Sequence, residues 1–292
     1  MLALYSDRLF MAAVGVYVLA MVLHAAEFAA ARSAKPVLVG GGAPDTAPAR
    51  SERFARMAVS LTVLGALLQF SSIAARGLAA GRWPLGNMYE FTSAICLAAV
   101  VGWLIMLRRS PVARAVGPFV LLPVVVLLFL AGTVLYAQAA PVVPALQSYW
   151  LVIHVTTITI SSGLLLVPGV ASVLFLVRDA GYLADRLPSS DVLDRLAYRT
   201  TIIAFPLFTF AVIAGAIWAE AAWGRFWGWD PKETIAFVSW VVYAAYLHAR
   251  ATAGWRATRA AWINVAGFAT VLFNLFFINM VVAGLHSYAG LG

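Results

Sequence analysis

Histidine and tryptophan are the side chains of this sequence that could hold a metal-centred ligand. The 292 residues include four histidines, His24, His154, His248 and His286. A neutral imidazole is a strong metal ligand. Residues 223–233 have the sequence Trp-Gly-Arg-Phe-Trp-Gly-Trp-Asp-Pro-Lys-Glu, and an indole face can pack on a flat ring while its N–H finds a polar partner. These residue types favour a site for a metal ion carried by a flat, apolar ligand.

The polar end of this run predicts a helix start. Asp230 can accept from exposed backbone N–H groups, Pro231 fits the first helical position, and Glu233 can reach back to the cap. We therefore expect residues 220–233 to form a rigid Trp-rich loop clamped to the next helix, with glycines that let a ligand approach the backbone. The candidate ligand-contacting residues are Trp218, Trp223, Gly224, Arg225, Trp227, Gly228, Trp229, Asp230 and Lys232.

The composition is that of an integral membrane protein. Hydrophobic residues make up 63% of the chain and charged residues 11%, against about 25% charged in soluble domains. The net charge of +8 comes from basic loops between apolar spans, so we expect no nucleic-acid partner and contact with a lipid bilayer. The single cysteine, Cys96, lies in an apolar span. It forms no disulfide within the chain, and the chain has no Cys-x-x-Cys-His haem-attachment motif. No cleavable signal peptide is evident.

Apolar runs of about 20 residues, long enough to cross a bilayer, predict an all-α polytopic membrane protein with about eight transmembrane helices. We expect these helices at 9–31, 57–76, 91–107, 116–137, 149–177, 200–219, 234–250 and 261–284. The segment 33–50, rich in Ala, Gly and Pro, is expected to be a flexible inner loop. No internal repeat is evident, and residues 1–292 are expected to form one domain.

The distribution of Lys and Arg predicts the orientation. Of these 20 residues, 15 fall in the connections 32–56, 108–114, 178–199 and 250–259. Under the positive-inside rule, this bias puts both termini and the Trp-rich loop on the outer side of a bacterial plasma membrane.

Capping is also expected at the third span. Asn87 and Glu90 match a capping box at its start. We expect both residues to cap the helix rather than to contact a ligand, with Glu90 as a minor ligand candidate because it lies on the same outer face as the Trp-rich loop.

The histidines are expected at two depths. His154, one turn into the fifth span, and His286, at the end of the eighth, should lie near the outer surface with the Trp-rich loop. Two imidazoles and several indoles at one level suit haem, whose iron takes axial imidazoles. Arg225 and Lys232 would pair with haem propionates, although a solvated loop tip or a lipid-phosphate contact explains these two cations equally well.

His24 and His248 are expected near the inner surface. His248 lies about 18 residues, hence roughly 27 Å along a helix, from the Asp230 cap. Ionisable groups within spans are costly and are functional candidates, so the two histidines could jointly ligate a second haem. For His24 we favour a structural role, as a hydrogen bond between helices or, with Glu27, as a marker of the inner interface.

The stretch from Trp218 to Glu233 resembles the tryptophan-rich WWD signature of haem-handling proteins. Within that group, the length, the expected spans and the histidine placement resemble the CcsA family, also called ResC and, in actinobacteria, CcsB. The segment Leu85-Gly86-Asn87-Met88-Tyr89-Glu90 also resembles a loop of this family. The resemblance extends over most of the chain from about residue 57.

The resemblance implies a haem-handling role in System II cytochrome c biogenesis. His154 and His286 would ligate haem b against the Trp-rich loop, and His248 would be an intramembrane ligand whose partner comes from a ResB-like membrane subunit. Haem b would be transported outward and presented to the Cys-x-x-Cys-His segment of apocytochrome c for thioether attachment. A thiol-reducing thioredoxin-like protein is a further implied partner. The chain would contribute orientation of haem to a haem-lyase complex rather than a catalytic residue of its own.

Three alternatives stay open. A System I-type haem-handling protein would pass haem to a carrier and would differ in the number of spans. A non-haem secondary transporter would use the loop as a gate, and such proteins often carry inverted repeats. A purely structural assembly subunit would leave the Trp-Gly spacing unexplained.

Overall fold

The fold is a bundle of long helices. The computed structural model describes residues 1–30, 46–142, 147–252, 255 and 257–286. Its helices are α1 (Leu2–Ala30), α2 (Thr46–Ala80), α3 (Met88–Arg109), the 3-10 helix η1 (Pro111–Val116), α4 (Gly117–Thr133), α5 (Tyr149–Asp179), α6 (Ser190–Trp223), α7 (Pro231–Ala251), α8 (Ala257–Phe273) and the π-helical turn η3 (Asn274–Ile278). These described residues contain no strand, which confirms the all-α prediction.

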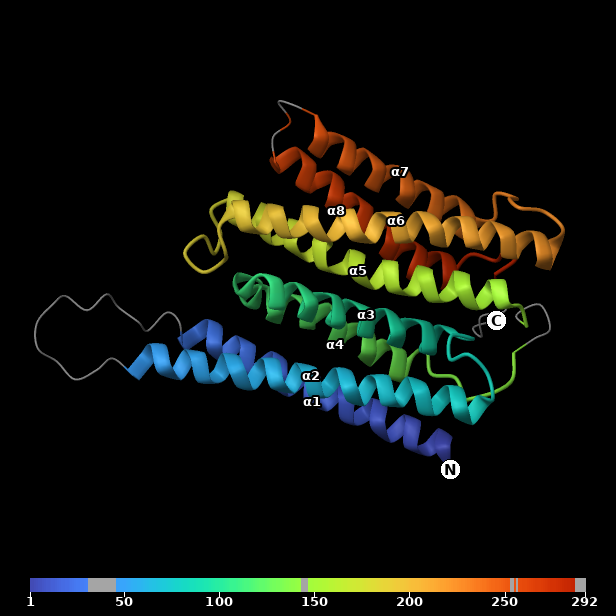
Figure 1. Ribbon diagram of the computed structural model, residues 1–292, viewed down its shortest axis with the longest axis horizontal. Helices are drawn as coiled ribbons and strands as arrows, with labels where there is room; N and C mark the ends of the chain where they lie inside the picture. The colour runs from blue at the N-terminus through green and yellow to red at the C-terminus, as the bar shows by residue number, and fades with distance from the viewer. Residues whose placement is uncertain (31–45, 143–146, 253–254, 256, 287–292) are drawn as a thin grey trace, which may run out of the picture.

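The helices match those of a polytopic membrane protein. Within the described ranges, seven segments are long and apolar enough to cross a membrane, namely Leu2–Ala29, Ser51–Ala80, Met88–Arg109, Pro111–Thr133, Tyr149–Asp179, Ser190–Trp223 and Ala257–Ile278. The remaining long helix, α7, has 21 residues and therefore extends about 31 Å, but it is more polar. It lies beside α6 and α8 in the bundle (Figure 1).

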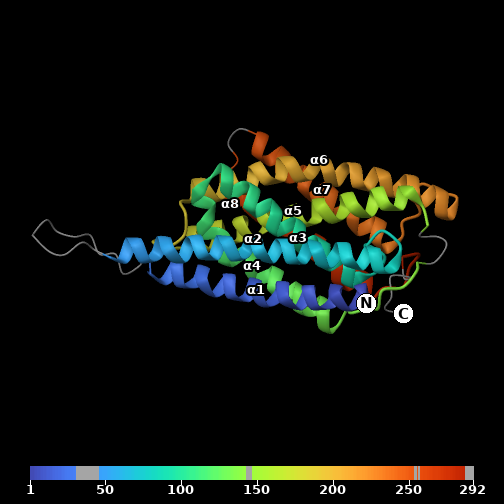
Figure 2. The same ribbon diagram turned by 60° about the horizontal axis from the view of Figure 1, so that its bottom comes forward.

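The helices run side by side along the long axis of the molecule and alternate in direction (Figures 1 and 2). α1 and α2 form one flank, α6, α7 and α8 form the opposite flank, and α3, α4 and α5 lie between them. The N-terminus, the turn between α2 and α3, the start of α5 and the α6–α7 connection gather at one end. We call this the loop end, and the opposite end the far end.

Several element boundaries differ from the predicted ones. α6 extends well beyond the expected span 200–219 at both ends, because an apolar run marks only the stretch suited to lipid and the helix continues into polar sequence. The first turn of α2 takes in residues 46–50 of the expected loop 33–50. Residues 33–45 of that loop lie outside the described part of the chain.

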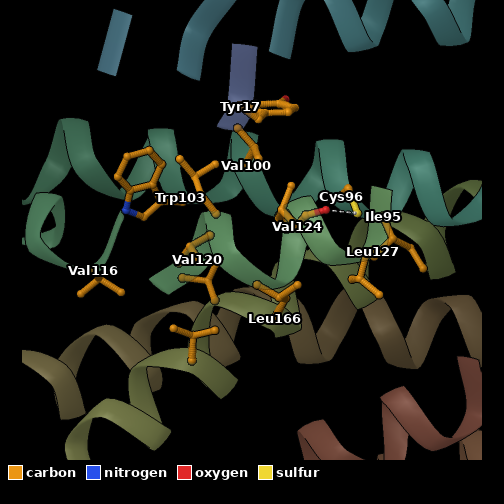
Figure 3. Packing of buried hydrophobic residues seen from close by; sticks show 14 of the residues in the cluster. Tyr17, Ile95, Cys96, Val100, Trp103, Val116, Val120, Val124, Leu127 and Leu166 are labelled. Carbon is orange, nitrogen blue, oxygen red and sulfur yellow. Dashed lines mark hydrogen bonds between the residues drawn. The ribbon is translucent and has the colours of Figure 1, made fainter. Parts of the chain in front are cut away.

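A close-packed core joins α1, α3 and α4. In Figure 3, Cys96 and Trp103 of α3 face the valines of α4. Cys96 is fully buried, as predicted for its place in a span, and its thiol lies 3.8 Å from the Val124 carbonyl. The indole N–H of Trp103 donates to the Ala113 carbonyl at 3.0 Å, which ties α3 to η1.

Gly163 allows α5 to lie close to α3. A Cβ at this position would fall 2.6 Å from the Ala98 Cβ and 2.9 Å from the Ala99 backbone nitrogen. We predict that Gly163→Ala lowers the free energy of unfolding by about 1–3 kcal/mol, because the helices must separate. Gly15→Ala is the matched control, since its added Cβ meets nothing within 4 Å. Thermal unfolding in detergent compares them, and equal midpoints for the two variants would contradict the close approach.

Candidate functional site

The Trp-rich loop is shorter than predicted because α6 continues to Trp223. Gly224 ends that helix in the left-handed region, with φ of 72° and its N–H donating to the Glu220 carbonyl at 2.8 Å. A residue without a Cβ adopts this conformation at no steric cost. Residues 220–223 are therefore helical, and the connection itself spans 224–230. From here on, the Trp-rich loop means residues 224–230.

The predicted capping box at the start of α7 is confirmed. Asp230 caps the helix, and the Glu233 side chain returns to the Asp230 N–H at 3.1 Å. The same Glu233 oxygen also accepts from the Gly228 N–H at 2.9 Å, so one carboxylate closes the loop. At Gly228 a Cβ would collide with the guanidinium of Arg225, which lies across it. The Glu233 carboxylate thus fixes the loop by accepting from two of its backbone N–H groups.

Trp229 takes a strained position at the outside of the loop. Its φ is 58°, and its side chain is 66% exposed. A bulky residue rarely adopts a positive φ. Its ring packs edge-on against Trp227 and Phe237, with centroids 5.9 and 6.3 Å away. Trp229 therefore supports Trp227 from the solvent side rather than facing inward.

A cavity of about 210 Å³ opens inside the bundle at the loop end. Six of the predicted site residues line it, namely His154, Trp218, Trp223, Trp227, Lys232 and His286. Five others lie outside its lining, namely Gly224, Arg225, Gly228, Trp229 and Asp230. Most of the wall is apolar, with a few polar groups, which is the usual make-up of a small-molecule site.

His154 is held by α6. Its Nδ1 lies 2.8 Å from the Ala211 carbonyl oxygen. Because a carbonyl only accepts, Nδ1 carries the proton, and the lone pair of a neutral ring is on Nε2. Gly215 makes room for the ring, since a Cβ there would fall 2.7 Å from it. The imidazole is nearly parallel to the indole of Trp218, with centroids 6.2 Å apart and planes at 6°.

His286 is held by the loop. Its Nδ1 lies 2.8 Å from a carboxylate oxygen of Asp230. The other Asp230 oxygen accepts from the Leu285 N–H at 2.7 Å. Burial raises the pKa of Asp230, but the hydrogen bonds from His286 and Leu285 outweigh burial and lower that pKa below its ordinary value. The ring also contacts Trp223 edge-on, with centroids 5.0 Å apart. Asp230 therefore orients His286 as well as capping α7.

The donor set suits a metal that brings most of its own ligands. In both histidines Nδ1 is bonded to an acceptor, a carbonyl for His154 and a carboxylate for His286. This is the usual outer partner of a metal-ligating imidazole, and it directs Nε2 to the metal. No group of three or more His, Cys, Asp or Glu side chains able to hold a metal occurs among the described residues. Two imidazoles are too few for the four ligands of a structural zinc ion, and they would suit the iron of a haem, which would supply its remaining ligands itself.

The segment 85–88 forms another wall of the cavity. The Asn87 side chain accepts from the Glu90 N–H at 2.9 Å, as predicted for the cap of α3. The Glu90 carboxylate does not return to Asn87. It binds Arg76 Nε at 2.9 Å and an Arg82 guanidinium nitrogen at 2.7 Å instead. Glu90 thereby anchors this wall to α2 without lining the cavity.

Sequence reasoning missed several polar residues of the lining, among them Glu233, Asn274 and Asn279. Glu233 was assigned only to the cap, although one of its oxygens is buried without a hydrogen-bond partner. Asn274, the first residue of the π-helical turn, and Asn279, which follows that turn, also line the cavity; such a turn is a distortion common at functional sites. Asparagines inside the last apolar span were the available signal in the sequence, because helices that face lipid rarely carry amide side chains.

His24 and His248 do not meet. His24, on α1, is buried; its Nδ1 lies 3.3 Å from a Glu27 oxygen, and its ring packs on Trp103. His248 is exposed on α7. Each lies in the last two turns of its helix, and α1 and α7 lie on opposite flanks of the bundle (Figures 1 and 2). Equal depth does not bring helices on opposite flanks together, so the arrangement of the helices gives a joint haem site of His24 and His248 no support.

Comparison with known proteins bears on the same residues. The family described as cytochrome C assembly protein matches residues 85–286. A relative from Parasynechococcus marenigrum, named cytochrome c biogenesis protein CcsA, is 35% identical over 259 residues, which cover 78% of this chain and 85% of that protein. A CcsA from a Synechococcus strain is 36% identical over 264 residues, with coverages of 80% and 85%.

A solved structure shares the fold. The cytochrome c haem lyase CcmF superposes with a TM-score of 0.71 over 94% of this chain. At 19% identity the likeness concerns the fold alone, and this chain spans only 47% of that longer protein. The match at 85–286 and the identities to curated relatives carry the assignment: the chain belongs to the cytochrome c assembly family and, within it, to the CcsA group of cytochrome c biogenesis proteins.

Proposed function

We propose that the chain binds haem b in its cavity through His154 and His286 and presents it to apocytochrome c for thioether attachment. The observation that carries this proposal is the pair of imidazoles in one apolar cavity, each with Nδ1 bonded to an acceptor. Trp218 contacts both rings, with centroids 6.2 Å from His154 and 5.7 Å from His286. Membership of a cytochrome c biogenesis family supports haem as the ligand.

Two cations are suited to the haem propionates. Lys232 lines the cavity, and its ammonium lies 3.5 Å from the His286 carbonyl, close to the proposed iron ligand. Arg225 lies across Gly228 on the loop. Charge-assisted hydrogen bonds from either side chain would hold a carboxylate. They would fix the porphyrin so that its vinyl groups face an incoming peptide.

The proposed complex follows the System II arrangement. The loop end would face the outside of a bacterial plasma membrane, supported by the 15 of 20 Lys and Arg residues in connections assigned to the other side. There a thioredoxin-like protein would keep the apocytochrome thiols reduced. A ResB-like subunit would dock where His248 is exposed on α7 and would supply the second ligand of an intramembrane haem.

Haem titration of the purified full-length chain tests the proposal. We expect saturable binding of one haem at the cavity, the absorption spectrum of a six-coordinate iron with two imidazoles, and quenching of tryptophan fluorescence. A chain that binds no haem would refute haem handling and leave a secondary transporter as the better explanation. A membrane topology with six spans would favour the System I alternative. Co-purification with a ResB-like subunit would favour System II.

A further inference from the structure

A second cavity lies beside the first at the loop end. Its volume is about 250 Å³, and it is lined by residues within 82–86 of the α2–α3 connection, by Val142 and by residues within 147–155 at the start of α5. We call it the side pocket. Its two main walls lie at the loop end (Figure 1). None of the residues predicted to bind haem is part of its described lining, so the function proposed above leaves it without a role.

The two cavities are separated by one thin wall. Leu85, Gly86, Leu151 and Val155 line both of them. At Gly86 the wall is backbone alone, and an added Cβ would fall 2.6 Å from a guanidinium nitrogen of Arg82. A ligand in the side pocket is therefore separated from a ligand in the first cavity by a single layer of residues.

Helix α5 presents a proposed iron ligand and the side pocket on adjoining faces. Positions three or four apart share one face of a helix. His154 and Ile158 therefore lie on one face, which lines the first cavity. Ser148, Val152 and Val155 lie on the next face, which lines the side pocket. The helix that positions His154 thus also positions the occupant of the side pocket.

The charge in the described lining of the side pocket is already paired. The charged residue there is Arg82, whose two terminal nitrogens donate to the Glu90 oxygens at 2.7 and 3.0 Å. Its Nε donates to the Ala140 carbonyl at 2.8 Å. An anionic headgroup or a free phosphate would need the donors that these partners occupy. The side pocket therefore suits an uncharged segment better than an anion.

The rest of the lining fits a peptide. Trp83 and Tyr149 are 52% and 70% exposed, and the indole N–H of Trp83 donates to the Thr156 hydroxyl of α5 at 2.9 Å. These rings offer apolar contact to side chains and polar atoms at their edges. Ser148 begins α5 without a side-chain cap. The first N–H groups of a helix need acceptors, and the carbonyl oxygens of an extended peptide would supply them.

We propose that the side pocket binds the apocytochrome c segment that carries the cysteines for haem attachment. The inference rests on the proposed function, which requires this segment to reach the edge of a haem held by His154. An uncharged peptide in the side pocket lies one layer of residues from that haem. The Glu90 carboxylate accepts from the Gly86 N–H at 2.8 Å and so holds the wall between the two substrates.

Peptide binding to the haem-free, full-length chain tests the assignment. A fluorescently labelled peptide with a reduced Cys-x-x-Cys-His sequence is titrated with the purified chain, and fluorescence anisotropy gives the dissociation constant. Val152 lines the side pocket and not the first cavity. We expect Val152→Trp to weaken peptide binding about tenfold, because its indole clashes with the peptide, and to leave the haem titration unchanged.

Val212→Trp is the matched control. Val212 is half-buried like Val152, but it lines the first cavity and not the side pocket. This variant should lose haem and keep the affinity for the peptide. Each variant thus retains one of the two ligands, which shows that it is folded.

Photo-crosslinking locates the peptide without any variant of the chain. A photoreactive residue between the cysteines of the peptide should label the start of α5 and the α2–α3 connection. Labelling confined to other segments would overturn the assignment, as would no peptide binding by the unmodified chain. An unchanged peptide affinity in Val152→Trp, with loss of a bound phospholipid, would assign the pocket to lipid instead. Failure of the haem titration alone would refute the haem site and leave the peptide site standing.

Discussion

Replacing either His154 or His286 by alanine is expected to remove most of the haem from the purified protein. Loss of an outer partner of a metal ligand costs about 10- to 100-fold in affinity, so loss of the ligand itself should cost at least that much. The remaining imidazole should leave a five-coordinate iron, visible as a change from the low-spin to the high-spin absorption spectrum. Haem titration of each variant gives the affinity and the spectrum together.

Two further variants make this result specific. His248→Ala removes an exposed imidazole on α7 and should leave the spectrum of the cavity haem unchanged. Asp230→Asn keeps His286 but removes the carboxylate that lies 2.8 Å from its Nδ1, so affinity should fall less than in His286→Ala, with both ligands retained. Unchanged haem content and spectrum in both alanine variants would rule out the assignment of His154 and His286.

Much of the candidate site could be predicted from the sequence. Its helix cap depends on a short sequence pattern, and the level of its histidines depends only on how far each lies along its membrane span. The Asp230 cap and the Glu233 return contact follow from their positions in a four-residue pattern, and both occur. The placement of His154 and His286 at one end follows from counting residues into each span. In a membrane protein the sequence predicts well how deep a residue lies in the membrane, because each span must cross a bilayer of constant thickness.

The position of each helix within the plane of the membrane, relative to the other helices, could not be predicted in this way. His24 and His248 share a level but lie on opposite flanks, because the order in which helices pack depends on contacts such as that of Gly163 with α3. The loop glycines were expected to admit a ligand. Instead, Gly224 meets a backbone requirement of the α6 end, and Gly228 makes room for Arg225. The role of a loop glycine depends on the local backbone and on where neighbouring side chains point. The spacing of residues along the chain does not reveal these directions.

The largest effect on stability is expected at Glu90. Its side chain is 1% exposed, and it pairs with Arg76 and Arg82, which are 3% and 12% exposed. Removing one partner of a buried ion pair leaves an uncompensated charge and costs about 3–5 kcal/mol. We expect Glu90→Ala to lower the free energy of unfolding in detergent by an amount near the lower end of that range. Arg76 keeps a contact with Asp7 at 3.4 Å, and Arg82 keeps the Ala140 carbonyl at 2.8 Å.

The matched control is Glu52→Ala, which breaks the Glu52–Arg114 ion pair, where the side chains are 47% and 33% exposed. An exposed pair contributes about 0–1 kcal/mol, so this variant should unfold close to the unmodified chain. Adding Arg82→Met to Glu90→Ala should recover part of the loss, because one unpaired guanidinium is then gone. If the cost at Glu90 came instead from lost packing, the second substitution would give no recovery. Equal unfolding midpoints for Glu90→Ala and Glu52→Ala would show that the buried pair does not anchor the 85–88 wall of the cavity.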